Sequence, residues 1–222
     1  MNKLRLLLVI LMLVIGLLLL FITPIQNAMV TRLSEQLSAK EYTTETIEQH
    51  QTTEADFEFE AVQSLSIAEV LQAQMKVNDM PVIGSIAIPH IDMQLPILKG
   101  VGNAVLAVGA GTMKPNQQLG KGNYALAGHY FEDKNILFSP LYQANIGDII
   151  YVTDMAEIYE YKLSEKKIIA ATDVFIIDDI SNKTLLTLIT CAENGTKRLA
   201  IQADFIQHYP FDKAPNILKG HF

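Results

Sequence analysis

The single cysteine of this chain is predicted to face an arginine across a β-hairpin. Cys191 follows the apolar run 185–190, and Asn194-Gly195 separates it from a second alternating run that begins at Arg198. Asn-Gly between two such runs is a strong hairpin signal, because both central residues of a type I′ turn need positive φ. The turn opposes three pairs of residues: Glu193 with Thr196, Ala192 with Lys197, and Cys191 with Arg198. Directly opposed side chains share one face, so the sequence predicts a thiol beside a guanidinium.

This pairing favours nucleophilic chemistry at Cys191. A neighbouring cation favours the thiolate, which is the nucleophilic form of cysteine. One cysteine cannot form an intramolecular disulfide, and an exposed thiol in an oxidising compartment is a liability unless it is used. The alternative interpretation is that Cys191 is a small buried apolar residue and Arg198 an unrelated surface cation.

A thiol nucleophile usually needs an imidazole, and His129 is the histidine best placed to supply it. It follows the strand-like run 123–127 directly after Gly128. The remaining histidines are expected to be solvated surface residues: His50, His90, His208 and His221.

Side-chain alternation extends this site into a groove. Ala125 and Ala127 share a strand face with His129, and Thr187 and Ile189 share the face of Cys191. If the two strands form opposite walls, they enclose a groove floored by small and apolar side chains. The three reactive side chains then stand at its end, and the groove suits an extended peptide with an aliphatic side chain.

Short strands must position these residues. The alternating and apolar runs predict strands over 84–88, 95–98, 106–108, 123–127, 148–153, 157–163, 184–191 and 198–206. Many short strands separated by turn signals favour one all-β sandwich or barrel. Short helices are expected near 66–76, where Ser66 and Glu69 resemble a capping box, and near 137–144. The stretch 168–177 is apolar and irregular.

The N-terminus predicts a membrane anchor. Lys3 and Arg5 precede an apolar stretch from Leu6 to Ile22, close to the length that spans a bilayer. No small-residue cleavage pattern follows, so we expect an uncleaved single-pass helix. The positive-inside rule places the N-terminus in the cytoplasm and the rest of the chain outside the cell membrane.

Three regions are expected along the chain. Residues 1–27 form the cytoplasmic tip and transmembrane anchor, 28–80 an extracytoplasmic stalk containing the helix near 66–76, and 81–222 the catalytic β-domain. Because the acidic stalk lacks a core-forming pattern, we expect a soluble, folded domain from about residue 80 onward. The net charge of −7 argues against nucleic-acid binding.

Several motifs together resemble the sortase family, the cysteine transpeptidases of Gram-positive surfaces. The resemblance rests on Thr187-Leu188-Ile189-Thr190-Cys191, on Ala127-Gly128-His129 upstream and on Arg198 downstream. The stretches 84–89, 95–97 and 137–140, and the N-terminal anchor, resemble the class A branch. The resemblance covers about residues 81–210 and implies a single closed eight-stranded β-barrel.

The resemblance also implies a reaction and its participants. Cys191 would attack the Thr–Gly carbonyl of an LPXTG-like sorting signal on a surface protein and hold the acyl group as a thioester. An amine of a peptidoglycan precursor, such as a lipid II-like molecule, would resolve it and anchor the protein to the cell wall. His129 would act as acid and base, and Arg198 would stabilise or orient the oxyanion. Ala127, Thr187, Ile189 and Thr190 are the candidate substrate-binding residues.

No cofactor or metal is expected. Some class A sortases are stimulated by calcium bound near the loop before the histidine strand, but here the loop 111–123 contains no Asp or Glu and carries Lys114 and Lys121. Calcium prefers several carboxylate ligands, so we expect activity without it. If calcium did bind, the acidic residues to examine first would be Glu132, Asp133, Asp178 and Asp179.

Three other interpretations stay open. A papain-like protease would need a helix that begins at the cysteine, whereas here a strand ends there. A pilus-polymerising sortase usually carries an extra lid and a second anchor, and neither is visible in this sequence. A non-catalytic membrane-tethered binding module would use Cys191 only as a core residue.

Overall fold

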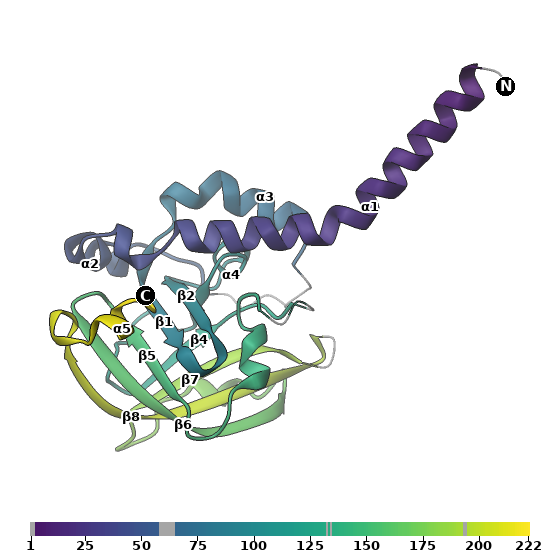
Figure 1. The fold of residues 1–222 in the computed structure, drawn as a ribbon. Coiled ribbons are helices and arrows are strands. Elements are labelled where there is room, and N and C mark those ends of the chain that lie inside the picture. Colours follow the sequence, from purple (N-terminus) through teal and green to yellow (C-terminus); the bar gives the residue numbers. More distant parts are fainter. Residues whose placement is uncertain (1–2, 58–64, 132, 134, 193–194) are drawn as a thin grey trace.

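The strands of this protein close into one eight-stranded β-barrel (Figure 1). The computed structural model describes residues 3–57, 65–131, 133, 135–192 and 195–222. The strands follow the order β1-β2-β3-β4-β7-β8-β6-β5 around the barrel. Their bounds are β1 Val82–Ile88, β2 Met93–Leu98, β3 Ala110–Thr112, β4 Asn123–Ala127, β5 Ile149–Thr153, β6 Glu157–Ala170, β7 Leu185–Ala192 and β8 Lys197–Pro210. The predicted all-β barrel is confirmed.

Helices lie along the N-terminal segment and in the connections between strands. The α-helices are α1 Lys3–Gln36, α2 Thr44–Thr52, α3 Ile67–Lys76, α4 Asn103–Leu106 and α5 Asn216–Lys219. Short 3₁₀ helices are η1 Ala39–Glu41, η2 Val77–Asp79, η3 Pro89–Ile91, η4 Ser139–Gln143, η5 Val174–Ile177 and η7 Phe211–Lys213. The expected capping box is present, because the Ser66 side chain accepts from the Glu69 amide and the Glu69 carboxylate accepts from the Ser66 amide. The helix near 137–144 is found as η4.

Two expectations about local structure were wrong. Residues 106–108 are not a strand, because Leu106 ends helix α4, and β3 begins only at Ala110. A short buried apolar run does not distinguish a helical turn from a strand. Glycine at 109 and 111 allows this segment to approach β2 closely, since an added Cβ would lie 2.6 Å from Leu98 Cδ1 and 2.3 Å from the Gly100 carbonyl oxygen, respectively. Residues 168–170, expected to be irregular, continue β6 and pair with β8.

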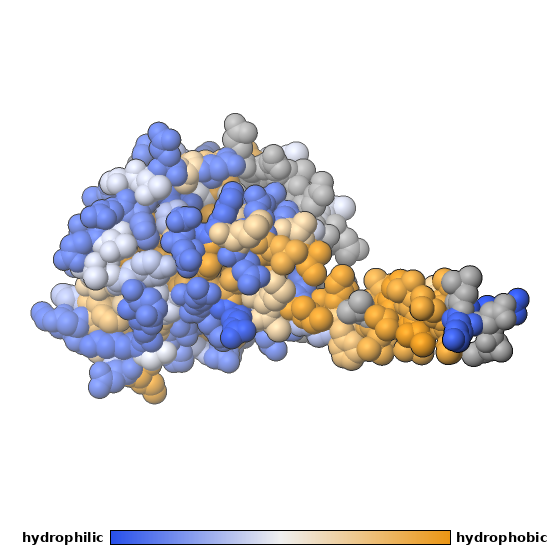
Figure 2. All heavy atoms as spheres, turned by 90° about the horizontal axis from the view of Figure 1, so that it is seen from above, coloured by the Kyte–Doolittle hydropathy of each residue, from blue (hydrophilic) through white to orange (hydrophobic). Residues whose placement is uncertain are grey.

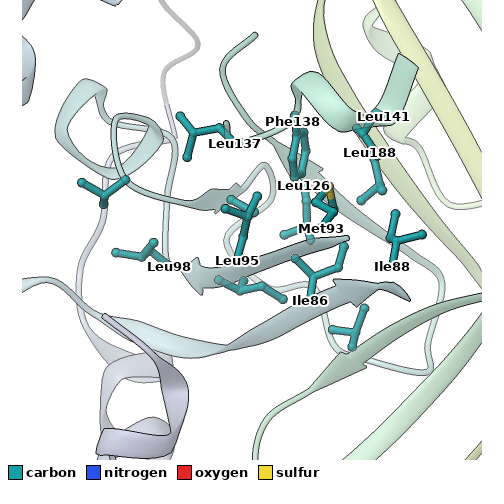
Figure 3. Close-up of a cluster of buried hydrophobic side chains, with 14 of the residues drawn as sticks. Ile86, Ile88, Met93, Leu95, Leu98, Leu126, Leu137, Phe138, Leu141 and Leu188 are labelled. Atoms are coloured by element: carbon teal, nitrogen blue, oxygen red, sulfur yellow. The ribbon is translucent and has the colours of Figure 1, made fainter. Parts of the chain in front are cut away.

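All eight strands contribute buried apolar side chains to the barrel core. Figure 3 shows Ile86 and Ile88 facing Met93, Leu95, Leu126 and Leu188 inside the barrel, with Phe138 and Leu141 closing one end. Every residue of β4 is buried, so both faces of this strand are covered. This packing makes β4 and β7 a rigid support for the residues at their carboxyl-terminal ends.

The segment expected to be a stalk packs against the barrel instead. Val30, Leu33 and Leu37 of the α1 region belong to the main core cluster, as do Val70 and Ala73 of α3. Helix α2, within the polar stretch, buries Ile47 and contacts β1. A few apolar residues at helical spacing inside a polar background were enough to bury one face of each helix. The division at residue 81 stays a prediction, but removal of 28–80 would uncover this apolar surface.

Helix α1 changes character along its length. Its apolar residues from Leu6 to Ile25 whose side chains are described are exposed, whereas Val30 and Leu33 are buried. Within the described residues, α1 is the one helix long and apolar enough to cross a membrane. Figure 1 shows its first half projecting beyond the body of the molecule. The exposed apolar part of α1 and the part that packs into the core therefore form one continuous helix.

Candidate active site

Cys191 and Arg198 face each other across the β7–β8 hairpin, as predicted. The register pairs Cys191 with Arg198 and Ala192 with Lys197, while the expected pairing of Glu193 falls outside the described residues. The Ile189 carbonyl accepts from the Gly128 amide on the β4 side, so the carbonyl of Cys191, two residues on, also points away from β8. Cys191 and Arg198 therefore form a non-hydrogen-bonded pair, the kind in which opposed side chains approach more closely.

His129 reaches the same place through the parallel pairing of β4 and β7. Ala127 pairs with Ile189, and His129 and Cys191 each lie two residues further along their chains. The two strands are hydrogen-bonded neighbours, so the expectation that they form opposite walls was wrong. They make a continuous floor, and both reactive side chains project from its carboxyl-terminal end.

The side chains of Cys191, His129 and Arg198 line one pocket. It is lined by Leu106, Ala127, Gly128, His129, Ile189, Thr190, Cys191 and Arg198. The thiol, the imidazole and the guanidinium expected from the sequence all line this pocket, together with Ala127, Ile189 and Thr190. The small and apolar floor continues into a cluster formed by Ala127, Val101 and Leu106.

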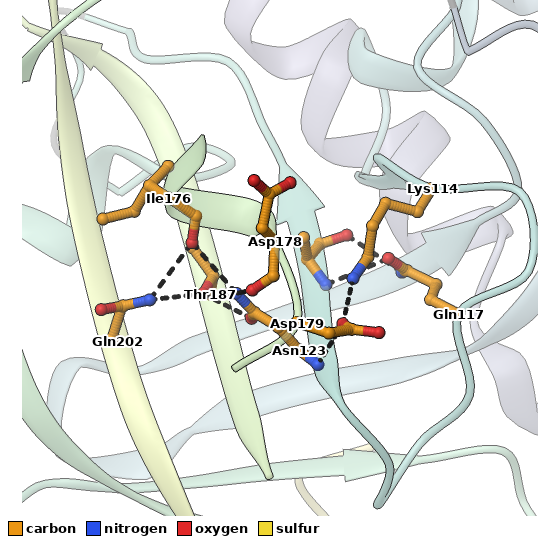
Figure 4. Close-up of polar contacts among 9 residues, drawn as sticks. Lys114, Gln117, Asn123, Ile176, Asp178, Asp179, Thr187 and Gln202 are labelled. Atoms are coloured by element: carbon orange, nitrogen blue, oxygen red, sulfur yellow. Dashed lines mark hydrogen bonds and ion pairs between the residues drawn. The ribbon is translucent and has the colours of Figure 1, made fainter. Parts of the chain in front are cut away.

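Thr187 lies elsewhere. It is fully buried, and its hydroxyl donates to Asn123 Oδ1 at 2.6 Å and accepts from Gln202 Nε2 at 3.2 Å (Figure 4). It is not among the residues that line the pocket. Thr190 does line the pocket, but its hydroxyl donates to the Gly128 carbonyl at 2.7 Å and so fastens β7 to the residue before His129.

The imidazole of His129 is buried with a nitrogen unsatisfied. The residue is 5% exposed, and Nε2 has no hydrogen-bond partner among the described residues. Burial lowers the pKa of His129 from 6.5 to about 4, because the charged form loses its hydration. A buried polar atom without a partner is costly and rare, and a reacting group that meets its partner only with substrate would explain it.

The thiol of Cys191 is also held in its neutral form. Burial raises its pKa above the usual value, and the opposing charge of Arg198 offsets only part of this effect. Together with the lowered pKa of His129, this favours a thiol and a neutral imidazole at neutral pH. The expected cation effect is present, but desolvation outweighs it.

Arg198 is held by the turn that follows Cys191. Its Nη1 donates to the Gly195 carbonyl at 2.8 Å and to the Lys197 carbonyl at 2.9 Å. A guanidinium carries further donors on Nε and Nη2, in a fixed planar arrangement. The turn therefore fixes the plane of the guanidinium beside Cys191.

Sequence reasoning missed two residues near the nucleophile. Leu106 of α4 lines the pocket, but its run was expected to be a strand. Tyr142 of η4 donates its hydroxyl to the Cys191 carbonyl at 3.1 Å, which satisfies a group that lies beyond the end of β4. Its ring also contacts Tyr130, the residue after His129. No local signal could reveal Tyr142, because it reaches Cys191 only through tertiary packing.

The loop before β4 carries a cation where a calcium site was considered. Lys114 Nζ lies 2.6 Å from Asp179 Oδ1, which also accepts from the Asn123 amide at 2.8 Å (Figure 4). These contacts lower the pKa of Asp179. Within the described part of the chain, no group of three or more His, Cys, Asp or Glu side chains is placed to hold a metal ion.

A thiol, an imidazole and a guanidinium that line one pocket at the ends of β4 and β7 are groups that cysteine acyl transfer can use. Comparison with known proteins narrows this class. The family model described as the sortase domain matches residues 86–206. Sortase A of Streptococcus agalactiae is 39% identical over 99% of this chain and 92% of its own length. Sortase A of Listeria monocytogenes is 40% identical over 82% of each chain.

A solved structure agrees with the sequence matches. The crystal structure of Listeria monocytogenes sortase A superposes with a TM-score of 0.60 and 38% identity, covering 64% of this chain and 97% of that one. The chain therefore belongs to the sortase family of cysteine transpeptidases, on the sortase A branch that anchors surface proteins. A papain-like arrangement is excluded, because Cys191 lies within strand β7 and not at the start of a helix.

Proposed function

We propose that Cys191 is the nucleophile that cleaves an LPXTG-like sorting signal between Thr and Gly. The Cys191 sulfur attacks the threonine carbonyl as its proton passes to His129 Nε2 or Nδ1. His129 then gives that proton to the glycine amine as the C–N bond breaks, leaving a thioester. The neutral resting pair described above means that proton transfer accompanies attack, and does not precede substrate binding.

The second half of the reaction reverses these proton movements. An amine of a peptidoglycan precursor attacks the thioester carbonyl, and His129 accepts its proton as the new amide bond forms. The C–S bond breaks and the proton returns to the Cys191 sulfur. The enzyme emerges unchanged, and the surface protein is joined to the cell-wall precursor.

Arg198 and the apolar floor complete the assignment. Arg198 stabilises the oxyanion of both tetrahedral intermediates through charge-assisted hydrogen bonds, since its guanidinium is held beside Cys191. Ala127 and Ile189, with Leu106, contact apolar side chains of the sorting signal. Thr190 supports the floor through its bond to Gly128, and Thr187 supports it from further along β7.

The membrane helix sets where this reaction takes place. Lys3 and Arg5 precede the apolar part of α1, so the positive-inside rule places them in the cytoplasm and the barrel outside the cell. The partners in this arrangement are surface proteins that carry the sorting signal and a lipid-borne peptidoglycan precursor. The chain uses no metal or organic cofactor in the proposed steps.

The observation that carries this proposal is the single pocket that holds the thiol, the imidazole and the guanidinium together. The test is to incubate the full-length protein with an LPXTG peptide and identify the acyl-enzyme by mass spectrometry. The adduct mass should equal the peptide up to and including Thr, attached to Cys191. A purified active protein that forms no adduct on Cys191 would contradict the mechanism.

A further inference from the structure

Helix α3 presents apolar side chains on two sides. Val70 and Ala73 are buried in the core. Ile67, Leu71 and Met75 are spaced four residues apart and so lie along one side of the helix, next to the buried side, with 36%, 47% and 80% of their surfaces exposed. The outward side of a surface helix is ordinarily polar. We call Ile67, Leu71 and Met75 the α3 stripe, and a stripe of this kind marks a contact surface.

The α3 stripe begins at the membrane boundary of α1. The apolar stretch of α1 from Leu6 to Ile22 is about 26 Å long at roughly 1.5 Å per residue, slightly less than the hydrocarbon core of a bilayer, and Thr23, Pro24 and Ile25 come after it. Gln26 follows immediately, and its Nε2 donates to the Leu65 carbonyl at 2.8 Å. Leu65 lies two residues before α3, so α3 begins beside α1 just beyond the apolar stretch.

The body of the protein is fixed at this level. Asn27 Nδ2 donates to Asp133 Oδ2 at 3.3 Å, which ties α1 to the loop that follows His129. Val30 and Leu33, one and two turns further on, are buried in the core. The barrel is therefore held against α1 directly beyond the membrane span and is not carried on a loose tether.

The apolar surface of α1 continues onto the body. Figure 1 shows α3 along the upper side of the molecule, next to α1. Figure 2, which views the molecule from that side, shows the hydrophobic surface of the projecting helix extending onto the adjoining face of the body. The charged residues of α3 are Glu69 and Lys76, one of each sign, so this face carries no net charge to repel or attract a membrane.

We propose that the α3 stripe rests in the surface of the lipid bilayer, on the side of the membrane that carries the barrel. The occupant is phospholipid, because the stripe is continuous with the surface of a membrane-anchoring helix. In this arrangement one side of α3 packs on the protein core, its exposed apolar side contacts lipid, and α1 is the anchor. Two attachments orient a rigid body where one would let it rotate. Given the proposed function, the catalytic pocket then keeps a constant height above a lipid-borne acceptor.

The sequence offers a clean way to test this contact, because it contains no tryptophan. A single introduced tryptophan is therefore the sole indole reporter. The full-length protein carrying Leu71→Trp would be reconstituted into phosphatidylcholine vesicles with and without nitroxide-labelled lipid. We expect the labelled lipid to reduce the emission at least about twofold, as for an apolar helix face buried at the interface. The reduction should persist at high salt, because an apolar contact is not screened.

Met75→Trp is a second reporter in case Leu71→Trp perturbs the fold. Ile217→Trp is the matched control, since Ile217 on α5 is apolar and, like Met75, 80% exposed. Figure 1 places α5 away from the projecting half of α1, so its emission should not change with labelled lipid. The same measurements on a Cys191→Ala background keep this test independent of the proposed catalysis.

Emission of both stripe reporters that is equal with and without labelled lipid would overturn the proposal. A blue shift without quenching would also overturn it, because the stripe would then be covered by protein, such as a second copy of this chain. Quenching of Ile217→Trp to the same extent would show non-specific adsorption of the body and would equally contradict a contact through α3.

Discussion

The two ends of the paired strands β4 and β7 differ in whether their buried polar groups have hydrogen-bond partners. At the end where the strands begin, the Asn123 side chain donates to the carbonyls of Ile176 and Asp178 and accepts from Thr187 (Figure 4). At the other end, His129 keeps a buried nitrogen that has no partner among the described residues. We call these the satisfied end and the open end.

This difference separates structure from function within one pair of strands. Buried polar groups with complete hydrogen bonding rigidify a fold, whereas a buried group without a partner costs stability. The same two strands therefore support the site at one end and expose its chemistry at the other. Changes at the open end should remove activity and leave the fold, and changes at the satisfied end should do the reverse.

The largest effect is expected at the open end, from Cys191→Ala. Cleavage and transfer should both be abolished, because no other residue of the chain supplies a thiol. The measurement is turnover of a sorting-signal peptide by the purified protein, with thermal unfolding as a check on the fold. Retained turnover by a folded Cys191→Ala protein would show that Cys191 is not the nucleophile.

His129→Ala and Arg198→Lys should each lower kcat/KM by at least about 10²-fold, the range for loss of an acid–base group or an oxyanion donor. Lysine keeps the charge of Arg198 but loses its planar set of donors. His90→Ala and His208→Ala are the controls and should be near normal, since these residues form exposed pairs with Asp148 and Glu157. Equal loss of activity in His208→Ala would refute the assignment of His129.

The pH dependence of stability should report the burial of His129. Its pKa is about 6.5 in the unfolded chain and about 4 in the folded protein. Between these values the unfolded state binds more protons, so the free energy of unfolding falls as pH drops from 6.5 to 4. The expected loss from this group is about 3 kcal/mol, because one pKa unit corresponds to about 1.4 kcal/mol.

Urea unfolding of wild type and His129→Gln across this pH range measures the effect. Glutamine does not titrate, so the variant should lose less stability than the wild type as pH falls. If the free energy of unfolding varied with pH in the same way for both proteins, His129 would be protonated as easily in the folded state as in the unfolded chain. The imidazole would then be exposed to solvent.

At the satisfied end, Asn123→Ala should destabilise the protein by about 1–3 kcal/mol, the cost of leaving buried partners unsatisfied. Activity per folded molecule should change little, since Asn123 does not line the pocket. Thr187→Val provides a matched test in the same network. A rise in KM for the peptide without a loss of stability would instead place Thr187 in substrate binding.

The smallest effect is expected from calcium. The rate of transfer should be equal in millimolar calcium and in chelator, because the Lys114 ammonium already occupies one oxygen of Asp179. Lys114→Met sharpens the comparison, since it removes the cation and keeps much of the stem. A several-fold loss of wild-type activity in chelator would contradict this prediction. It would mean that calcium binds through ligands other than the Asp179 oxygen paired with Lys114.

Local sequence patterns predicted the candidate site. The Asn-Gly signal predicted the hairpin register that opposes Cys191 and Arg198, and alternation predicted that His129 follows its strand on the face of Ala125 and Ala127. The membrane helix was also predicted from the sequence, because a long apolar stretch that follows two basic residues is typical of a membrane anchor. These signals act between residues that are close along the chain, and tertiary structure did not need to be known.

Local patterns did not predict which elements contact one another, because these contacts depend on tertiary packing. The tertiary structure made β4 and β7 parallel neighbours and brought Leu106 and Tyr142 to Cys191 from distant segments. It also packed Val30, Leu33 and Ile47 of the supposed stalk against the barrel. The pKa of Cys191 rose for the same reason, because burial depends on every element that covers the thiol. Desolvation and long-range contacts are properties of the assembled core, and no local pattern encodes them.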